Sequence, residues 1–174
     1  DLVRINNDIN NDRLKDNKNL ISALEWVKEK KSTLHLLGLL SDGGVHSHID
    51  HLKYLLKVAK DNNITSTVIH VITDGRDTSP NSGINYLKEL QDYIKKINYG
   101  EIVSICGRYY AMDRDKRWDR IKLAYDLYLN GKGEQFSDFN KAMSQSYKNK
   151  ITDEFITPKI SKNNKGIIKD KDAV

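Results

Sequence analysis

The sequence predicts an α/β fold, a mainly parallel sheet with helices on both faces, built on a β-α-β-α-β-α core. Three short segments rich in Leu, Val and Ile, at 33–39, 65–73 and 102–106, have the composition of buried strands. Longer segments with apolar residues at helical spacing separate them. Because strands joined by helices run parallel and are covered on both sides, this alternation predicts the fold class.

The predicted helices follow apolar residues that recur every three or four positions. They cover 19–31, 47–62, 82–97, 116–129 and 138–147. Ser47 is predicted to cap the second helix, because a serine hydroxyl accepts hydrogen bonds from the free N–H groups of a first turn. Gly131 and Gly133 indicate the end of the fourth helix. Beyond Thr152 the pattern weakens into short extended pieces, "EFITP" at 154–158 and "GIIK" at 166–169.

The composition is that of one globular domain. The 174 residues are 38% hydrophobic and 30% charged, which suffices for a core under a well-solvated surface. A run of about 18 apolar residues, which a membrane span needs, is absent. The chain starts on polar residues without a methionine, so we expect it to be a piece of a longer protein. Its single cysteine, Cys106, excludes an internal disulfide and favours a reducing, cytoplasmic location.

The net charge of +5, from 29 basic and 24 acidic residues, favours an anionic partner such as nucleic acid, a membrane surface or a small anion. Much of the excess is lysine scattered among asparagines, as in 162–172, which is typical of a solvated surface. A non-catalytic basic module that binds nucleic acid stays an alternative. Such a module needs aromatic residues among the basic ones, and Tyr109-Tyr110 beside Arg108 is the only such pair.

Three loops that follow the predicted strands carry the most informative ionisable residues. They cover 41–48, 74–80 and 107–115. In a parallel α/β sheet, ligands bind beyond the carboxyl ends of the strands, so we expect these loops to meet at one rim. The side chains expected to share that rim are His46, His48, Asp74, Arg76, Asp77, Arg108 and Arg114.

These residue types together are suited to an anionic ligand. Gly43-Gly44 allows a sharp turn at positive φ and a close approach of the backbone to a ligand. The helix start that follows offers free N–H groups and the positive end of a dipole. Guanidinium groups bind phosphate or carboxylate through paired hydrogen bonds. An aspartate among them stays ionised and can accept a proton from a bound hydroxyl.

Structural interpretations of the same residues remain open at this point. The glycine pair can be a plain turn, and "DGRD" at 74–77 can be a turn pinned by ion pairs. Arg108 and Arg114 can pair with the aspartates at 113, 115 and 119 on the surface. His35 and His70 lie in predicted strands and are expected to be packed. A metal site at His46 and His48 lacks the further ligands that zinc sites use.

The three loops resemble a known family. "GLLSDGGVHSH" at 38–48, "VITDGRDTSP" at 71–80 and "GRYYAMDRDKRWDR" at 107–120 together are similar to cofactor-independent phosphoglycerate mutases, and "TDEFITP" at 152–158 agrees. The resemblance implies a two-domain glycolytic isomerase that needs no 2,3-bisphosphoglycerate. One domain, similar to alkaline phosphatase, holds two divalent metal ions, often manganese, and a serine that becomes phosphorylated. The other, the transferase domain, holds the glycerate.

By this resemblance the chain is the transferase domain, with no metal ligands of its own. It implies a linker at 1–18, an α/β phosphotransferase domain at 19–150, and extended segments at 151–174 that lead back to the metal-binding domain. The residues that match the family's substrate-binding positions are His46, Arg76, Asp77, Arg108 and Arg114. Asp77 matches a general acid/base for the glycerate hydroxyls.

The expected partners are phosphoglycerate and the metal-binding domain, with neither nucleic acid nor membrane, and the isolated chain is expected to be inactive. Another phosphomutase or a phosphatase of the alkaline phosphatase superfamily is the main alternative function.

Overall fold

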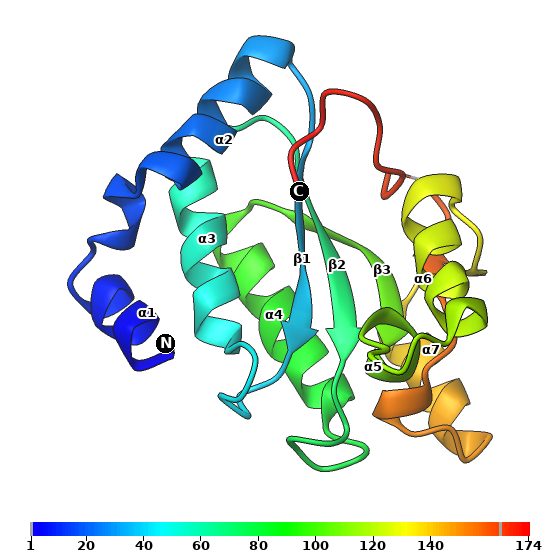
Figure 1. Ribbon diagram of the computed structural model, residues 1–174. Helices are drawn as coiled ribbons and strands as arrows, with labels where there is room; N and C mark the ends of the chain where they lie inside the picture. Colours follow the sequence, from blue (N-terminus) through cyan, green and yellow to red (C-terminus); the bar gives the residue numbers. More distant parts are fainter. Residues whose placement is uncertain (1, 164) are drawn as a thin grey trace.

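The computed structural model describes residues 2–163 and 165–174, and its centre is a twisted sheet in the order β1-β2-β3-β5-β4 (Figure 1). Three long parallel strands, β1 (Leu34–Leu40), β2 (Thr67–Thr73) and β3 (Glu101–Gly107), lie side by side. Their carboxyl ends point the same way, as the arrowheads in Figure 1 show. The mainly parallel sheet predicted from the sequence is confirmed.

Two short strands that the sequence pattern did not indicate complete the sheet. β5 (Lys159–Ser161) pairs with β3 in the antiparallel direction, and β4 (Glu134–Phe136) pairs with β5 in the parallel direction. The first expected extended piece, at 154–158, instead includes part of a 3-10 turn, Asp153–Phe155. This turn brings "TDEFITP" close to the carboxyl end of β3, because Gly107 N donates to Ile156 O at 2.7 Å.

The helices agree with the predicted ones to within about two residues and add two that were not predicted, α1 and the short α5. Their bounds are α1 Leu2–Asn10, α2 Lys18–Lys30, α3 Ile49–Asp61, α4 Gly83–Ile97, α5 Arg108–Ala111, α6 Trp118–Asn130 and α7 Phe139–Lys148. A further 3-10 turn, Leu14–Asp16, joins α1 to α2. The helix α1 therefore lies inside the segment that was expected to be a linker.

Helices cover both faces of the sheet, as predicted. On one face, Leu56 of α3 and Leu90 of α4 pack against Ile69 and Val71 of β2. On the other face, Ala124 and Leu127 of α6 pack with Cys106 at the end of β3. The apolar contacts are buried and continuous around β2 and β3, so the carboxyl ends of these strands are fixed with respect to each other.

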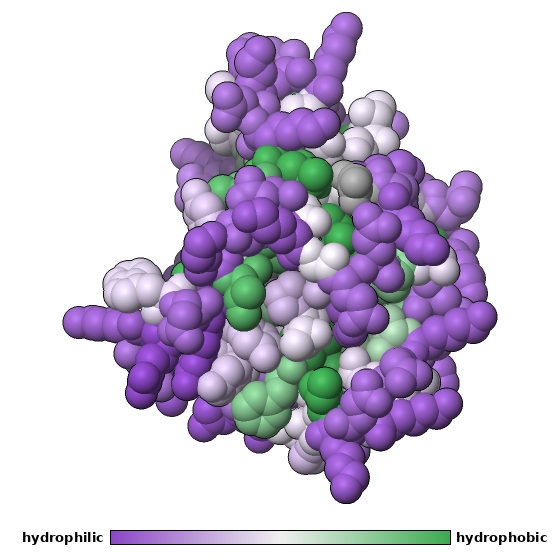
Figure 2. All heavy atoms as spheres, turned by 90° about the vertical axis from the view of Figure 1, so that its right-hand side faces the viewer, coloured by the Kyte–Doolittle hydropathy of each residue, from purple (hydrophilic) through white to green (hydrophobic). Residues whose placement is uncertain are grey.

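The outer side of α6 carries large apolar side chains that face solvent. Trp118 is 72% exposed and Tyr125 58% exposed, whereas the small Ala124 and Leu127 make the buried contacts. Figure 2 views the side of the molecule that carries α6 and shows apolar residues scattered among hydrophilic ones. The apolar residues at helical spacing in this segment thus only partly mark its buried face.

The predicted cap of α3 is wrong by one residue. His48 is the N-cap, and its ring Nδ1 accepts a hydrogen bond from Asp50 N at 3.2 Å. The Ser47 hydroxyl instead donates to Leu39 O at 2.6 Å and ties the loop back to β1. The serine is therefore used for the strand end, and a histidine nitrogen replaces it as the acceptor at the helix start.

Candidate functional site

The three loops meet at the carboxyl ends of β1, β2 and β3 and form a pocket of about 120 Å³. His46 from the first loop, Arg76 from the second, and Arg108 and Arg114 from the third all line it. Asp77 lies against two of these side chains. The structure therefore brings together the five residues that the sequence singled out as substrate-binding.

Asp77 and Arg108 form the central contact. Arg108 Nη1 lies 2.7 Å from Asp77 Oδ2, and the Arg108 side chain is only 11% exposed. His46 Nε2 lies 3.7 Å from the same carboxylate oxygen. The carboxylate is thus flanked by a cation on one side and an imidazole on the other, and its side chain remains 19% exposed.

Asp74, at the end of β2, joins the three loops from below. Its Oδ2 accepts from Ser41 Oγ at 2.7 Å. Its Oδ1 accepts from Arg76 N at 3.1 Å, from Asp77 N at 3.0 Å and from Arg108 Nη1 at 2.7 Å. The loop "DGRD" is therefore held by a carboxylate that accepts its backbone N–H groups, and Arg108 adds an ion pair.

The charges of this pair are stable. Burial by itself would raise the pKa of Asp74, but the hydrogen bonds from Ser41, from the backbone and from Arg108 outweigh it and lower the pKa. For Arg108, burial opposes the charge, and the two carboxylates outweigh it and raise the pKa. Asp74 therefore stays a carboxylate and Arg108 stays a cation at neutral pH.

The glycines of the rim allow the loops to pack closely. Gly44 adopts φ +65°, the left-handed conformation expected for the glycine pair. A Cβ at Gly43 would lie 3.1 Å from the Cβ of Asp77, so the first two loops are in contact there. A Cβ at Gly107 would lie 2.3 Å from Glu154 O, which only a glycine avoids. The 3-10 turn thus completes the rim beside β3.

Arg76 and Arg114 face the solvent side of the pocket. The Arg76 side chain is 57% exposed, and its Nη1 lies 3.6 Å from Glu154 Oε1. Arg114 is exposed and makes no hydrogen bond or ion pair within 2–163 and 165–174. The alternative that Arg108 and Arg114 pair with aspartates on the surface does not hold for the described residues, because Asp113 contacts Arg120, and Arg108 contacts Asp74 and Asp77. Both exposed arginines are accessible to an anion.

Sequence reasoning missed a second layer of residues at the rim. Asp113, whose side chain is 1% exposed, accepts from Arg117 N at 2.9 Å and from Arg120 Nη1 at 3.3 Å. The Arg120 guanidinium lies over the Tyr109 ring at 3.9 Å. An aspartate whose side chain accepts from the backbone N–H groups two and four residues later closes many loops. The sequence "DRDKR" at 113–117 contains the residues for this pattern, and this signal could have predicted the role of Asp113.

The other four histidines do not line the rim pocket; His48, expected there, lies with His51 in a larger cavity, and His35 and His70 lie inside the sheet. His35 Nδ1 and His70 Nε2 share a hydrogen bond of 2.9 Å, His70 Nδ1 contacts Ser104 Oγ at 2.7 Å, and His35 Nε2 contacts Asp172 at 3.2 Å. Burial lowers the pKa of His35, and it lowers that of His70 to about 3. Both are packed, as predicted for residues in strands.

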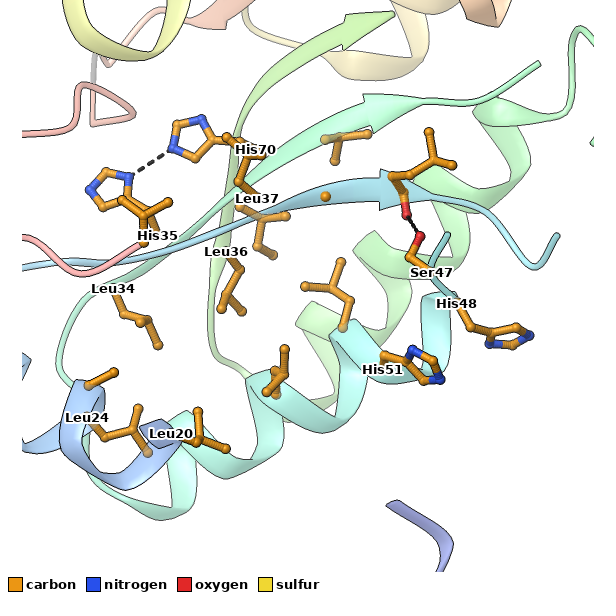
Figure 3. Close-up of a pocket in the computed structure, with 18 residues that line it drawn as sticks. Leu20, Leu24, Leu34, His35, Leu36, Leu37, Ser47, His48, His51 and His70 are labelled. Atoms are coloured by element: carbon orange, nitrogen blue, oxygen red, sulfur yellow. Dashed lines mark hydrogen bonds between the residues drawn. The ribbon is translucent and has the colours of Figure 1, made fainter. Parts of the chain in front are cut away.

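A larger cavity of about 360 Å³ runs along β1, and Figure 3 shows it. Leucines from α2, β1 and α3 line most of it, with His48 and His51 at one end and the His35–His70 pair at the other. Arginine and lysine are absent from its lining among the described residues. The apolar cavity therefore offers no charge for an anion, and the smaller rim pocket is the functional candidate.

Two further questions about the described residues are whether they could hold a metal ion and whether a helix among them could cross a membrane. Within 2–163 and 165–174, His, Cys, Asp and Glu do not gather in groups of three that could hold a metal ion. The residues present therefore do not match a metal centre. None of the helices in the described part of the chain is long and apolar enough to cross a bilayer.

Comparisons with known proteins find relatives that match this chain over nearly its whole length. The chain is 46% identical over 177 residues to the 2,3-bisphosphoglycerate-independent phosphoglycerate mutase of Clostridium tetani, covering 100% of this chain and 34% of the relative. For the enzyme of that name from Listeria monocytogenes the identity is 48% over 176 residues, with 99% and 34% covered. The chain thus spans about a third of the length of these relatives.

A solved structure and a family model indicate the same family. A crystal structure of Leishmania mexicana phosphoglycerate mutase at low cobalt concentration superposes with a TM-score of 0.93 at 26% identity, covering 99% of this chain and 34% of that one. Residues 5–174 match the family model described as the BPG-independent PGAM N-terminus. The chain therefore belongs to the family of BPG-independent phosphoglycerate mutases, within the part that this model describes.

Proposed function

We propose that this chain is the substrate-binding, phosphotransfer domain of a longer protein that interconverts 2- and 3-phosphoglycerate. The observation that carries the proposal is the rim pocket. The exposed Arg76 and Arg114, the part-buried Arg108 and His46 line it, and the last two lie against the Asp77 carboxylate, which is 19% exposed. A small molecule with a phosphate, a carboxylate and a hydroxyl matches that arrangement, because each of its groups finds a partner of opposite charge or a proton acceptor.

In this proposal each residue has a separate role. Arg76 and Arg114 bind the phosphate and carboxylate, since their guanidinium groups are exposed on the pocket. Asp77 accepts a proton from the glycerate hydroxyl that attacks and returns one to the oxygen that leaves. Arg108 and His46 orient the Asp77 carboxylate from two sides. The pocket thereby binds, orients and exchanges a proton.

We assign the remaining chemistry to the other part of the longer protein. The residues present here do not match a metal centre, so we propose that the divalent metal ions and a phosphorylated serine lie outside this chain. Residues 1–18 and 151–174 then connect the domain to that part. A cytoplasmic location accords with the single buried Cys106, whose pKa burial raises to about 12.

Product analysis tests the proposal. The longer protein, with manganese and 3-phosphoglycerate, is expected to form 2-phosphoglycerate, followed by ³¹P NMR. Release of inorganic phosphate as the main product would instead identify a phosphatase. The isolated chain of 174 residues is expected to show no turnover above background in the same assay. Clear turnover by the isolated chain would contradict the division of roles.

A further inference from the structure

Asp74 holds a position that differs from that of the substrate-binding residues. It is 1% exposed, and its carboxylate accepts from each of the three loops, through Ser41, through the backbone of Arg76 and Asp77, and through Arg108. Neither Asp74 nor Asp77 is among the residues that line the rim pocket, but the Asp77 side chain is 19% exposed and the Asp74 side chain only 2%. Asp74 therefore acts on a ligand through other residues rather than by contact.

One nitrogen connects Asp74 with Asp77. Arg108 Nη1 lies 2.7 Å from Asp74 Oδ1 and 2.7 Å from Asp77 Oδ2, so the two carboxylates share a single guanidinium nitrogen. Their surroundings differ. The Asp74 side chain is 2% exposed and has three further donors, whereas the Asp77 side chain is 19% exposed and has His46 as its other neighbour.

This asymmetry separates a permanent charge from an exchangeable one. A buried carboxylate with several donors is held in its ionised form, because each hydrogen bond favours the charged state. If Asp77 takes up a proton, Arg108 loses one of its two anionic partners. A guanidinium left with no charged partner in a part-buried place would move toward water. The contact with Asp74 prevents this movement.

We propose that Asp74 is a positioning residue that keeps the Arg108 guanidinium in place in both protonation states of Asp77. The inference rests on the proposed function for the proton exchange at Asp77, but the fixed geometry it describes can be measured in the isolated chain. A second consequence follows for the ligand. Arg108 is ready to bind an anion throughout the reaction, because its orientation does not depend on Asp77.

The experiment compares two neutralising variants of the isolated chain. Asp77→Asn imitates the protonated residue, and Asp74→Asn removes the permanent charge. The ¹⁵N heteronuclear NOE of Arg108 Nε reports whether the side chain is ordered, and calorimetry gives the Kd for 3-phosphoglycerate. We expect an ordered Arg108 in wild type and in Asp77→Asn, and a mobile one in Asp74→Asn.

The affinity for 3-phosphoglycerate is an independent measurement, because two explanations of Asp74 predict changes in opposite directions. If Asp74 were only a negative charge near the site, its neutralisation would strengthen the binding of an anionic ligand. The positioning role predicts that Asp74→Asn weakens binding by about tenfold or more, the scale of one charge-assisted hydrogen bond, whereas Asp77→Asn leaves it unchanged or tighter. Ser41→Ala, which retains the Asp74 charge, is the matched control and is expected to leave Arg108 ordered.

Each result of these measurements either supports or overturns the positioning role of Asp74. An Arg108 that is as ordered in Asp74→Asn as in wild type, or that is mobile in Asp77→Asn, overturns the proposal. If Asp74→Asn does not fold, as a thermal melt would show, the Asp77→Asn spectrum alone still tests it. Failure to bind 3-phosphoglycerate with the expected NOE pattern intact would overturn the proposed function and leave the positioning role standing.

Discussion

The same three strands carry two lines of polar residues, and the two lines differ in almost every property. At the carboxyl ends, the line runs through Ser41, Asp74 and Arg108. Inside the sheet, a second line runs through His35, His70 and Ser104. In each line, one residue comes from β1 or its loop, one from β2 or its loop, and one from β3 or the residue after it.

Charge and access separate the two lines. The rim line holds ionised groups and opens on a pocket with exposed arginines. The interior line holds imidazoles whose pKa values burial lowers, and it ends at Asp172 near the C-terminus. Neutral polar groups that satisfy each other stabilise a sheet, whereas exposed cations around a carboxylate bind a ligand. Of these two lines, the comparison therefore makes the rim the functional candidate.

The largest expected effect is on catalysis and belongs to the rim alone. In the longer protein, Asp77→Asn retains the shape of the side chain but cannot accept a proton. We expect kcat to fall by about 10²–10⁴, with KM changed much less. Steady-state kinetics with a thermal melt measures both, and an unchanged kcat would show that Asp77 serves only to hold its loop.

A matched variant of the interior line provides the control. Asp172 is also a nearly buried aspartate with several donors, namely Thr33 N at 2.9 Å and Lys169 N at 2.8 Å besides His35. Asp172→Asn is expected to lower the melting temperature and to leave kcat near that of wild type. A similar loss of kcat in both variants would remove the distinction between the two lines.

The next effect is on stability at acid pH and belongs to the interior line. The pKa of His70 falls from 6.5 to about 3 on folding, because burial disfavours the imidazolium. Above pH 6.5 both states are neutral and stability is complete. As the pH falls from 6.5 toward 3, the unfolded chain takes up the proton and the folded chain does not, so stability is lost at up to about 1.4 kcal/mol per pH unit.

Urea unfolding at a series of pH values measures this dependence. Between pH 7 and pH 5 we expect a loss on the order of 2 kcal/mol from His70, and His35 adds to it because burial lowers its pKa as well. In His70→Gln the dependence should be shallower, since glutamine does not titrate. A free energy of unfolding that stays constant over this range would mean that the imidazoles accept protons in the fold.

The smallest of the three effects compares two serines that are both 1% exposed. Ser104→Ala removes the partner of the His70 ring, and Ser41→Ala removes one of several partners of Asp74. Each is expected to cost about 1–2 kcal/mol of unfolding free energy. Neither change should alter the Kd for 3-phosphoglycerate measured by calorimetry, because Ser41→Ala retains the Asp74 charge and Ser104 lies inside the sheet. Weaker binding in Ser41→Ala would show that the Asp74 charge alone does not hold Arg108 in place.

The meeting of the three loops at one rim could be predicted from the sequence, because it depends only on successive strands being parallel neighbours. Successive parallel strands end on the same side, so loops that follow them meet whatever their details. That reasoning placed His46, Asp77 and Arg108 together without knowledge of any contact. The turn at Gly43-Gly44 could also be predicted, since a positive φ depends on the single residue, and Gly44 adopts it.

The rest depends on contacts between distant segments that local patterns do not encode. Asp74 reads as one more polar loop residue, and its central place follows only from the positions of Ser41 and Arg108. Glu154 reaches the rim because β5 returns antiparallel to β3. The cap of α3 was misassigned because Leu39 O competes for the Ser47 hydroxyl. A local propensity yields to such tertiary partners.

The position of β1 at the edge of the sheet affects how the chain behaves at high concentration. In the described residues, no further strand covers its outer side between Leu34, which bridges to Ala173, and Leu39, whose carbonyl accepts from the Ser47 hydroxyl, and Leu37 between them is 41% exposed. Free N–H and C=O groups along an uncovered strand invite pairing with another molecule. The isolated chain should therefore self-associate as its concentration rises, and Gly38→Lys, at a position with open space, should keep it monomeric in sedimentation experiments.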